Sequence, residues 1–178
     1  MSFDALTHVD ASPTREHQAL WVQAARKAGV SGWTVASTVP SGWNQVLQVA
    51  KETGGVPLLG IHPWWAETVS LRELEKWAEH LSRQVGLHGI GEIGLDYAKT
   101  KQSASREHQM AVFARQLQLA RTLNLPVALH CVRAHSDLLH HLKKTGLAKA
   151  GGLMHGWTGG PQFIQNALDL GLHISFGP

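Results

Sequence analysis

The chain has few of the residues that mark secreted or membrane proteins. Cys131 is its only cysteine, which excludes an internal disulfide framework and makes a reducing compartment the simplest expectation. The N-terminal residues include no basic segment followed by an apolar one, so a signal peptide is not expected. No apolar run approaches the ~18 residues that a membrane-spanning helix needs. We therefore expect a cytoplasmic protein that has no membrane partner.

Charged residues are also scarce. They make up 16% of the 178 residues, and the formal net charge is +3. The high isoelectric point therefore reflects few charges rather than a basic stripe, and it is compatible with an anionic substrate without indicating one. A hydrophobic content of 43% and this length predict a single globular domain over residues 1–178. Two residue types are abundant, with 12 histidines and 7 tryptophans.

Short apolar runs alternate with segments of helical periodicity. Ser12-Pro13 is a start signal for one helix, and the capping box that opens at Ser70 is a start signal for another. Strands that alternate with helices predict a parallel α/β sheet. Two architectures fit: a doubly wound open sheet, or a TIM-type (β/α)8 barrel, here incomplete with about seven strands. The predicted strands are Phe3–Leu6, Trp33–Ser37, Val56–His62, Gly89–Leu95, Pro126–Cys131, Gly151–His155 and Leu172–Phe176.

Polar residues at the ends of these runs favour the barrel. Four runs end in the motifs GIHP, GEIGLD, ALHC and LMHG, which carry His62, Glu92 with Asp96, His130 and His155. In a barrel the functional groups gather at the carboxyl ends of several strands, whereas in a doubly wound sheet they cluster at one switch point. A single such histidine is ordinarily a hydrogen-bonded loop residue, but four coincidences make that explanation poor. Imidazoles and a carboxylate that converge from separate strands suit Zn, Mn or Mg ions.

The remaining histidines are expected to be solvated, because they fall on helical segments or at strand starts. His135, just beyond the strand that ends at His130, is left open. The seven that we expect in solvent are His17, His80, His88, His108, His140, His141 and His173.

The motifs GIHP, GEIGLDY, LPVALHC and MHGWTGG, in that order and at those spacings, resemble the TatD family of metal-dependent deoxyribonucleases. The family belongs among the amidohydrolase-like barrels. The similarity runs from Phe3 to Phe176, and GEIGLDY is its most specific part. The resemblance implies a hydrolase of phosphodiester bonds in DNA, single-stranded or at ends. It also implies one or two divalent ions (Mg, Mn or Zn) that activate the attacking water.

The resemblance also implies roles for individual residues. In the family a glutamate bridges two metals, one of which is completed by two histidines from later strands. The other metal is held by histidines of the first strand and an aspartate of the eighth. Carried over, the metal ligands are His8, Glu92, His130 and His155, and the catalytic groups are Glu92 and Asp96. Substrate binding falls to His62, Arg133 and Trp64; many relatives place the arginine one residue earlier, at Val132.

Two departures from the family put activity in doubt. In DALTHVD, residues 4–10, Leu6 occupies the position of the first histidine and is a degenerate ligand position. A competing register makes His8 and Asp10 the ligands but loses the match at Asp4. The family's closing strand, with the aspartate expected to act as base, would follow Pro178. Alternatives are therefore a catalytically impaired subunit or scaffold and a hydrolase of small amides or esters. A protein partner or self-association across the open side of the barrel is also expected.

Overall fold

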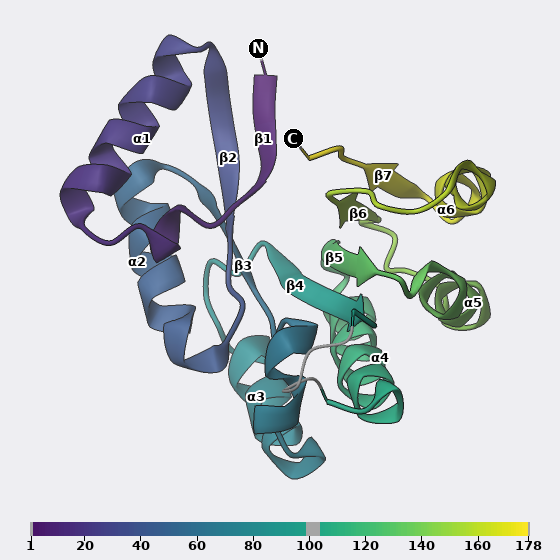
Figure 1. Cartoon of the computed structure of the whole chain (residues 1–178). Coiled ribbons are helices and arrows are strands. Elements are labelled where there is room, and N and C mark those ends of the chain that lie inside the picture. The colour runs from purple at the N-terminus through teal and green to yellow at the C-terminus, as the bar shows by residue number, and fades with distance from the viewer. Residues whose placement is uncertain (1, 99–103, 178) are drawn as a thin grey trace.

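The computed structural model describes residues 2–98 and 104–177, and it contains one seven-stranded parallel sheet with the order β1-β2-β3-β4-β5-β6-β7. Neighbours in sequence are thus neighbours in the sheet, which curls with its helices outside (Figure 1). This confirms the incomplete TIM-type barrel. The strands are β1 Ser2–Thr7, β2 Val30–Ala36, β3 Val56–Leu59, β4 Gly89–Asp96, β5 Val127–Val132, β6 Gly152–His155 and β7 Leu172–Ile174.

The cap of α3 lies at its predicted start signal, whereas α1 begins at Arg15, two residues after Pro13. Thr14 and Ser105 accept hydrogen bonds from backbone N–H groups in the first turns of α1 and α4, and Ser70 forms the predicted capping box with Glu73. The α-helices are α1 Arg15–Lys27, α2 Trp43–Thr53, α3 Leu71–Ser82, α4 Arg106–Leu123, α5 His135–Thr145 and α6 Ile164–Asp169. Short 3-10 helices are η1 Val9–Ala11, η2 Pro40–Gly42, η3 Pro63–Thr68 and η4 Pro161–Phe163.

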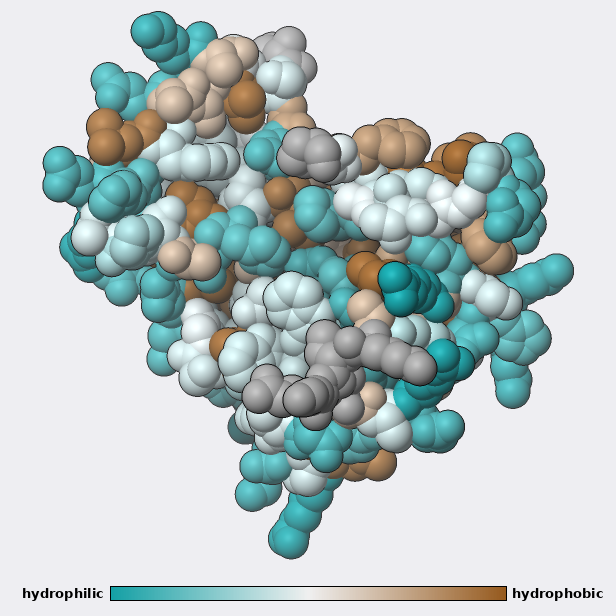
Figure 2. All heavy atoms as spheres, viewed as in Figure 1, coloured by the Kyte–Doolittle hydropathy of each residue, from teal (hydrophilic) through white to brown (hydrophobic). Residues whose placement is uncertain are grey.

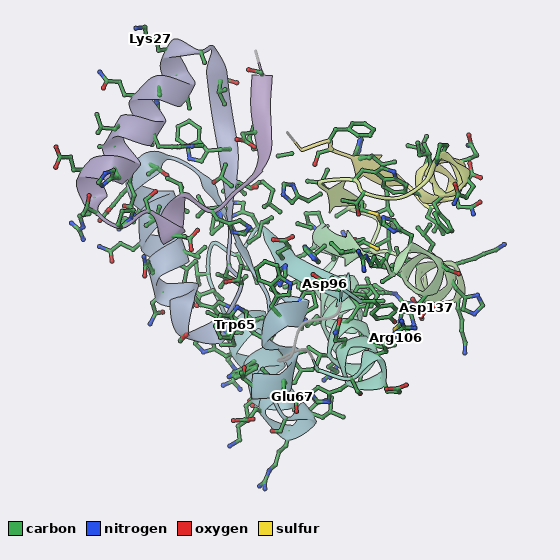
Figure 3. All side chains as sticks on the ribbon, in the orientation of Figure 1. Lys27, Trp65, Glu67, Asp96, Arg106 and Asp137 are labelled. Carbon is green, nitrogen blue, oxygen red and sulfur yellow. The ribbon has the colours of Figure 1, made fainter. Side chains whose placement is uncertain are left out.

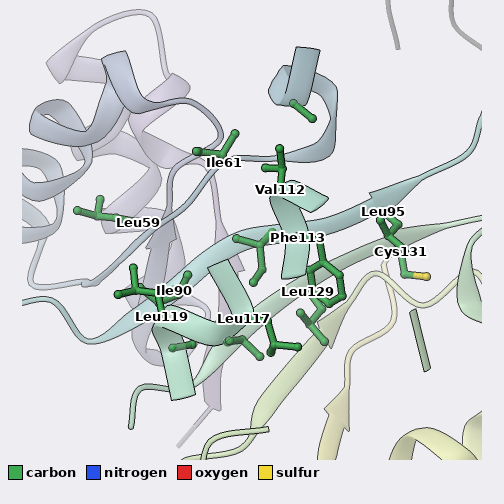
Figure 4. Close-up of a cluster of buried hydrophobic side chains, with 14 of the residues drawn as sticks. Leu59, Ile61, Ile90, Leu95, Val112, Phe113, Leu117, Leu119, Leu129 and Cys131 are labelled. Atoms are coloured by element: carbon green, nitrogen blue, oxygen red, sulfur yellow. The ribbon is translucent and has the colours of Figure 1, made fainter. Parts of the chain in front are cut away.

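The main core lies between the sheet and the surrounding helices. All residues of β4 are buried, as expected for a central strand covered on both faces. Phe113 and Leu117 of α4 pack in one buried cluster with Ile90 and Leu129 of the sheet (Figure 4). Polar side chains dominate the periphery of the molecule in Figure 2, where apolar patches are small and separate. Among the described residues, no helix combines the length and apolar character required to cross a membrane.

A second, smaller cluster lies on the concave face of the sheet. It consists of Leu6, Ala36, Leu58 and Ala128, with Leu153 packed against it. Leu58 and Leu59 are neighbours on β3 but belong to different clusters, because successive side chains of a strand point to opposite faces. The side chains that point inward toward the carboxyl ends of the strands therefore lie above this small apolar floor.

Gly94 explains why the GEIGLD motif needs its second glycine. Its φ is +142°, and a Cβ atom added there would lie 2.0 Å from the carbonyl oxygen of His130. Only glycine accepts this backbone conformation at so close an approach. The residue therefore lets β4 and β5 come together at the level where Glu92, Asp96 and His130 lie.

Two predicted strands are too long. The third strand was expected to run to His62, but β3 ends at Leu59. The reason is that the backbone of Ile61 bonds to the side chain of Gln116 on α4 instead of to a neighbouring strand. The last strand likewise ends at Ile174 rather than Phe176.

Candidate metal centre

The predicted site residues converge at the carboxyl ends of the strands. A cavity of about 330 Å³ there is lined by side chains that follow or end β1, β3, β4, β5 and β6. Asp96, at the end of β4, lies in the middle of the molecule, whereas Lys27 at the end of α1 lies at its periphery (Figure 3). The lining residues include His8, Thr38, His62, Trp64, Glu92, His130 and His155.

Glu92 is the centre of this arrangement and is 2% exposed. Its Oε2 lies 3.1 Å from His8 Nε2, and its Oε1 lies 3.1 Å from His130 Nδ1 and 3.9 Å from His62 Nε2. Burial alone would raise the pKa of Glu92, but the hydrogen bonds with His130 and His8 outweigh burial and hold that pKa well below its ordinary value. The carboxylate is therefore ionised in the folded protein.

His8 and His130 each present both ring nitrogens to oxygens that accept hydrogen bonds. His8 Nδ1 donates to the carbonyl of Ala36 at 2.9 Å while Nε2 faces Glu92. His130 Nδ1 faces Glu92 and its Nε2 faces Asp96 Oδ2, both at 3.1 Å. The hydrogen bond to Glu92 raises the pKa of His8, and the hydrogen bonds and charges of Glu92 and Asp96 raise that of His130 despite its burial. Both imidazoles are thus fixed in the site by hydrogen bonds at each of their ring nitrogens.

His62 behaves in the opposite way. Burial and the neighbouring His130 ring lower the pKa of His62 to about 4, so its imidazole is neutral. Nδ1 accepts a hydrogen bond from the backbone N–H of Trp64 at 3.2 Å, which leaves the proton on Nε2, facing Glu92. The rings of His62 and His130 lie 4.2 Å apart. His62 was predicted to bind substrate; the structure places its ring beside the Glu92 carboxylate, and its role stays a prediction.

Asp96 extends the network. Its Oδ2 accepts hydrogen bonds from Trp64 Nε1 at 2.7 Å and His130 Nε2 at 3.1 Å, and its Oδ1 accepts one from the backbone of Ala98 at 2.9 Å. Burial opposes ionisation, but these bonds keep the pKa of Asp96 below its ordinary value. A continuous chain of polar contacts therefore runs from His8 through Glu92, His130 and Asp96 to Trp64. The ring of Trp64 remains largely exposed.

The donor set fits a divalent cation. One nitrogen each from His62 and His130 and one oxygen of Glu92 all lie within 4.8 Å of one another. Two imidazoles and a carboxylate are ligands that Zn, and to a lesser degree Mn, accept in catalytic sites. The described residues thus contain a possible His/Glu metal site on the strands where the sequence predicts one.

His155, predicted as a ligand, is not part of that group of three. It is half-buried, lines the same cavity from β6, and its Nδ1 lies 3.4 Å from Ser175 Oγ. Burial lowers the pKa of His155, so it is a neutral imidazole available to a metal. Arg133 is exposed, has a φ of +54°, and is not among the lining residues of the cavity. The roles of both residues stay predictions.

Leu6 lies two residues before His8 on β1 and is buried in the concave apolar cluster. The position of His8 beside Glu92 fits both registers, because each of them makes His8 a ligand. Asp10, the second ligand of the competing register, lies in η1, and its buried Oδ1 has no hydrogen-bond partner among the described residues. The choice of register stays a prediction.

The other histidines differ in part from expectation. His17, His80, His88, His140 and His173 are exposed, as predicted. His108 is half-buried, with Nε2 3.0 Å from the carbonyls of Ala66 and Val69, and His141 packs on Phe113; for these two the prediction is wrong. His135, for which the sequence predicts neither exposure nor burial, is buried between Trp157 and Phe163.

Two glutamines of α4 were missed from sequence. Gln109 and Gln116 are buried and bond to the backbone at the ends of β4 and β3. Both residues fall on the apolar stripe that carries Phe113 and Ala120. A polar residue on such a stripe indicates a buried side chain that needs hydrogen-bond partners.

Comparison with known proteins agrees with the geometry. The family model described as TatD related DNase matches residues 3–178. The chain is 32% identical over 176 residues to the uncharacterized metal-dependent hydrolase YjjV of Escherichia coli K12, covering 98% of this chain and 67% of that protein. It is 34% identical over 162 residues to the 3'-5' ssDNA/RNA exonuclease TatD of Klebsiella pneumoniae, covering 90% of this chain and 60% of that protein.

Solved structures give the same result. The crystal structure of the YjjV protein of E. coli superposes with a TM-score of 0.88 at 32% identity, over 97% of this chain and 66% of that one. A TatD family hydrolase from Entamoeba histolytica shares the fold with a TM-score of 0.81 at 20% identity. The chain spans between about half and two thirds of the length of the curated relatives it matches most strongly. From its motifs, its sheet and these matches, the chain belongs to the TatD related DNase family.

Proposed function

We propose that the chain carries the metal-binding face of a hydrolase that cleaves phosphodiester bonds in DNA, in single strands or at ends. The observation that carries the proposal is Glu92, buried and ionised, with His8, His62 and His130 around it at the carboxyl ends of four strands. The family supports hydrolysis, and nucleic acid as substrate is supported by the name of the TatD exonuclease relative.

Each residue has a definite task in this proposal. Glu92, His130 and, once its Nε2 has released its proton, His62 would hold one divalent ion, Mg, Mn or Zn, and His8 and His155 would supply ligands to it or to a second. A divalent ion at this position supplies activation of water and neutralisation of phosphate charge. Asp96 orients His130 and offers a carboxylate that can accept a proton.

Two residues at the rim suit a nucleic acid. The exposed indole of Trp64 offers a face on which a base can stack. Arg133, exposed on the loop after β5, can pair with phosphate oxygens. Arg133 lies outside the cavity lining, so its loss should raise KM before it lowers kcat, whereas loss of the Trp64 indole would also remove a hydrogen bond to Asp96.

Cleavage of an end-labelled single-stranded oligonucleotide, with and without Mn, tests the proposal. We expect cleavage that needs the metal and that Glu92→Gln lowers by at least ~100-fold. Glu79→Gln, on an exposed residue of α3, is the matched control and should not change the rate. Cleavage that survives both chelation and Glu92→Gln would contradict the proposal.

A second candidate is a subunit or scaffold that has lost activity. The observation that favours it is Leu6, buried in an apolar cluster where the family places a ligand. This candidate predicts that the chain binds a divalent ion but cleaves no oligonucleotide. The cleavage assay, run beside a metal titration, distinguishes the two.

A further inference from the structure

The buried glutamines of α4 lie on the face of the helix that packs against the sheet. Gln109 and Gln116 are seven residues apart, about two turns, so they share one side of the helix. Each is 3% exposed. A buried amide needs partners for both its oxygen and its nitrogen, and here both partners are backbone groups of strand ends.

Gln116 takes the place of a neighbouring strand for Ile61. Its Oε1 accepts from the N–H of Ile61 at 2.8 Å, and its Nε2 donates to the carbonyl of the same residue at 3.1 Å. The pairing of β3 with β4 ends at Leu59 and Ile90. The backbone that leads into His62 is therefore held by helix α4 (Ile61 and α4 residues are shown in Figure 4).

Gln109 makes the corresponding pair of hydrogen bonds to Asp96, at the end of β4. Its Oε1 accepts from the N–H of Asp96 at 2.9 Å, and its Nε2 donates to the carbonyl of Asp96 at 3.0 Å. The same nitrogen lies 3.1 Å from the carbonyl of Ala104, just before α4. One side chain thus ties the end of β4 to the start of the helix.

The segments held by Gln116 and Gln109 are also connected to each other at the site. Trp64 donates its backbone N–H to His62 and its indole N–H to Asp96. His130 contacts both, through its ring against His62 and through Nε2 to Asp96. A shift of either strand end relative to α4 would therefore move the groups that surround Glu92.

We propose that Gln109 and Gln116 are positioning residues. They anchor the backbone of Asp96 and of the residue before His62 to helix α4, and so fix the places of Asp96 and His62 around Glu92. Neither side chain lies among the residues that line the cavity, so they act through the backbone and through other residues. The inference deepens the proposed function, because it names the parts of the fold that give that site its geometry.

The test uses Gln109→Met and Gln116→Met, which keep an unbranched side chain of similar length and remove both hydrogen bonds. In the metal-free protein we expect the indole N–H resonance of Trp64 and the ring nitrogen resonances of His130 to shift. In titrations we expect the Mn affinity to fall by ~10–100-fold. Gln109→Glu and Gln116→Glu retain the acceptor, and because burial favours the protonated carboxyl they can also retain the donor, so they should give smaller changes of the same kind.

The control for a general loss of stability is Leu119→Ala, a buried residue of the same helix with no bond to either strand end. We expect it to lower the Tm while leaving the Trp64 and His130 resonances and the Mn affinity unchanged. Resonances and affinity that stay as in the wild type in folded methionine variants, or that move equally in Leu119→Ala, would overturn the inference. If a methionine variant does not fold, its glutamate counterpart is judged by the same criteria.

The failure of this inference is distinct from the failure of the proposed function. A wild-type protein that binds no Mn contradicts the proposed function, whereas the metal-free resonances of Trp64 and His130 still decide whether the glutamines position the site.

Discussion

At the scale of single residues, the site is an ionised glutamate hydrogen-bonded to two imidazoles whose pKa values it raises. Both ring nitrogens of His8 and of His130 face oxygens, and a nitrogen that carries a proton must release it before it can ligate a metal. Metal and protons therefore compete for the same nitrogens, which makes metal binding depend on pH in a defined direction.

We predict that the Mn affinity rises with pH. The pKa values of His8 and His130 are raised above 6.5, so both rings stay protonated at and somewhat above that pH, and the affinity is lowest there. As pH increases through the raised values the rings lose their protons and the affinity increases. Calorimetric titration between about pH 6 and pH 8.5 should show this rise together with proton release on binding. His17→Gln, on an exposed histidine of α1, should leave the profile unchanged; a flat profile in the wild type would refute the account.

We predict that Leu6→His strengthens metal binding by ~10-fold or more, because it restores a ligand two residues before His8. The same change puts an imidazole into the concave cluster with Ala36, Leu58 and Ala128, so the free energy of unfolding should fall by ~1–3 kcal/mol. Leu153→His, in the same cluster, is the matched control and should give the destabilisation without the gain in affinity. Unchanged stoichiometry and affinity in Leu6→His would favour His8 and Asp10 as the ligands.

The residue types of the site could be predicted from the sequence, but their grouping could not. His62 and His155 both end strands, and nothing in GIHP or LMHG says which of them lies closer to Glu92. The difference arises because the segment after β3 bends away from its neighbour strand and is held by Gln116, a contact between residues 55 positions apart. Such a contact has no local signature beyond a polar residue on an apolar stripe.

At the scale of elements, the close approach of β4 and β5 decides the geometry. We predict that Gly94→Ala lowers the free energy of unfolding by more than ~3 kcal/mol, because its Cβ would overlap the carbonyl oxygen of His130. Gly86→Ala is the matched control: it also has a positive φ, +79°, but open space around it, so it should cost only ~1–2 kcal/mol. Equal losses in a chemical denaturation series would show that β4 and β5 tolerate a wider separation.

Helix and strand positions were largely predictable, since caps and apolar runs are local signals. Ser70 with Glu73 marked the start of α3, where the structure has the capping box. The ends of β3 and β7 could not be predicted. A strand ends where its hydrogen bonds to the neighbouring strand end, and these bonds depend on tertiary contacts.

At the scale of the whole molecule, the sheet is not closed. Among the described residues β1 pairs with β2 alone and β7 with β6 alone, so each has one unpaired edge. Phe3 on β1 is 56% exposed and Phe176 just after β7 is 73% exposed. Unpaired strand edges beside apolar side chains recruit other chains.

We therefore predict that the 178-residue chain, made alone, self-associates or binds a protein partner across its open side. Size-exclusion chromatography with light scattering should show an oligomer, and Phe3→Lys should shift it toward the monomer by placing a charge at the edge. Leu71→Lys, on an exposed residue of α3, the helix that connects the central strands β3 and β4, should have no effect. A stable monomer of the wild-type chain would contradict the prediction.

The central claim is that Glu92 and the imidazoles around it form a divalent-metal site. Calorimetric titration of Mn into the wild-type chain, Glu92→Gln and Glu67→Gln tests it most directly, since Glu67 is an exposed carboxylate of η3 outside the cavity. The account predicts saturable binding in the wild type and in Glu67→Gln, and an affinity at least ~100-fold lower in Glu92→Gln. Equal affinities in all three proteins would place the metal elsewhere and contradict the account.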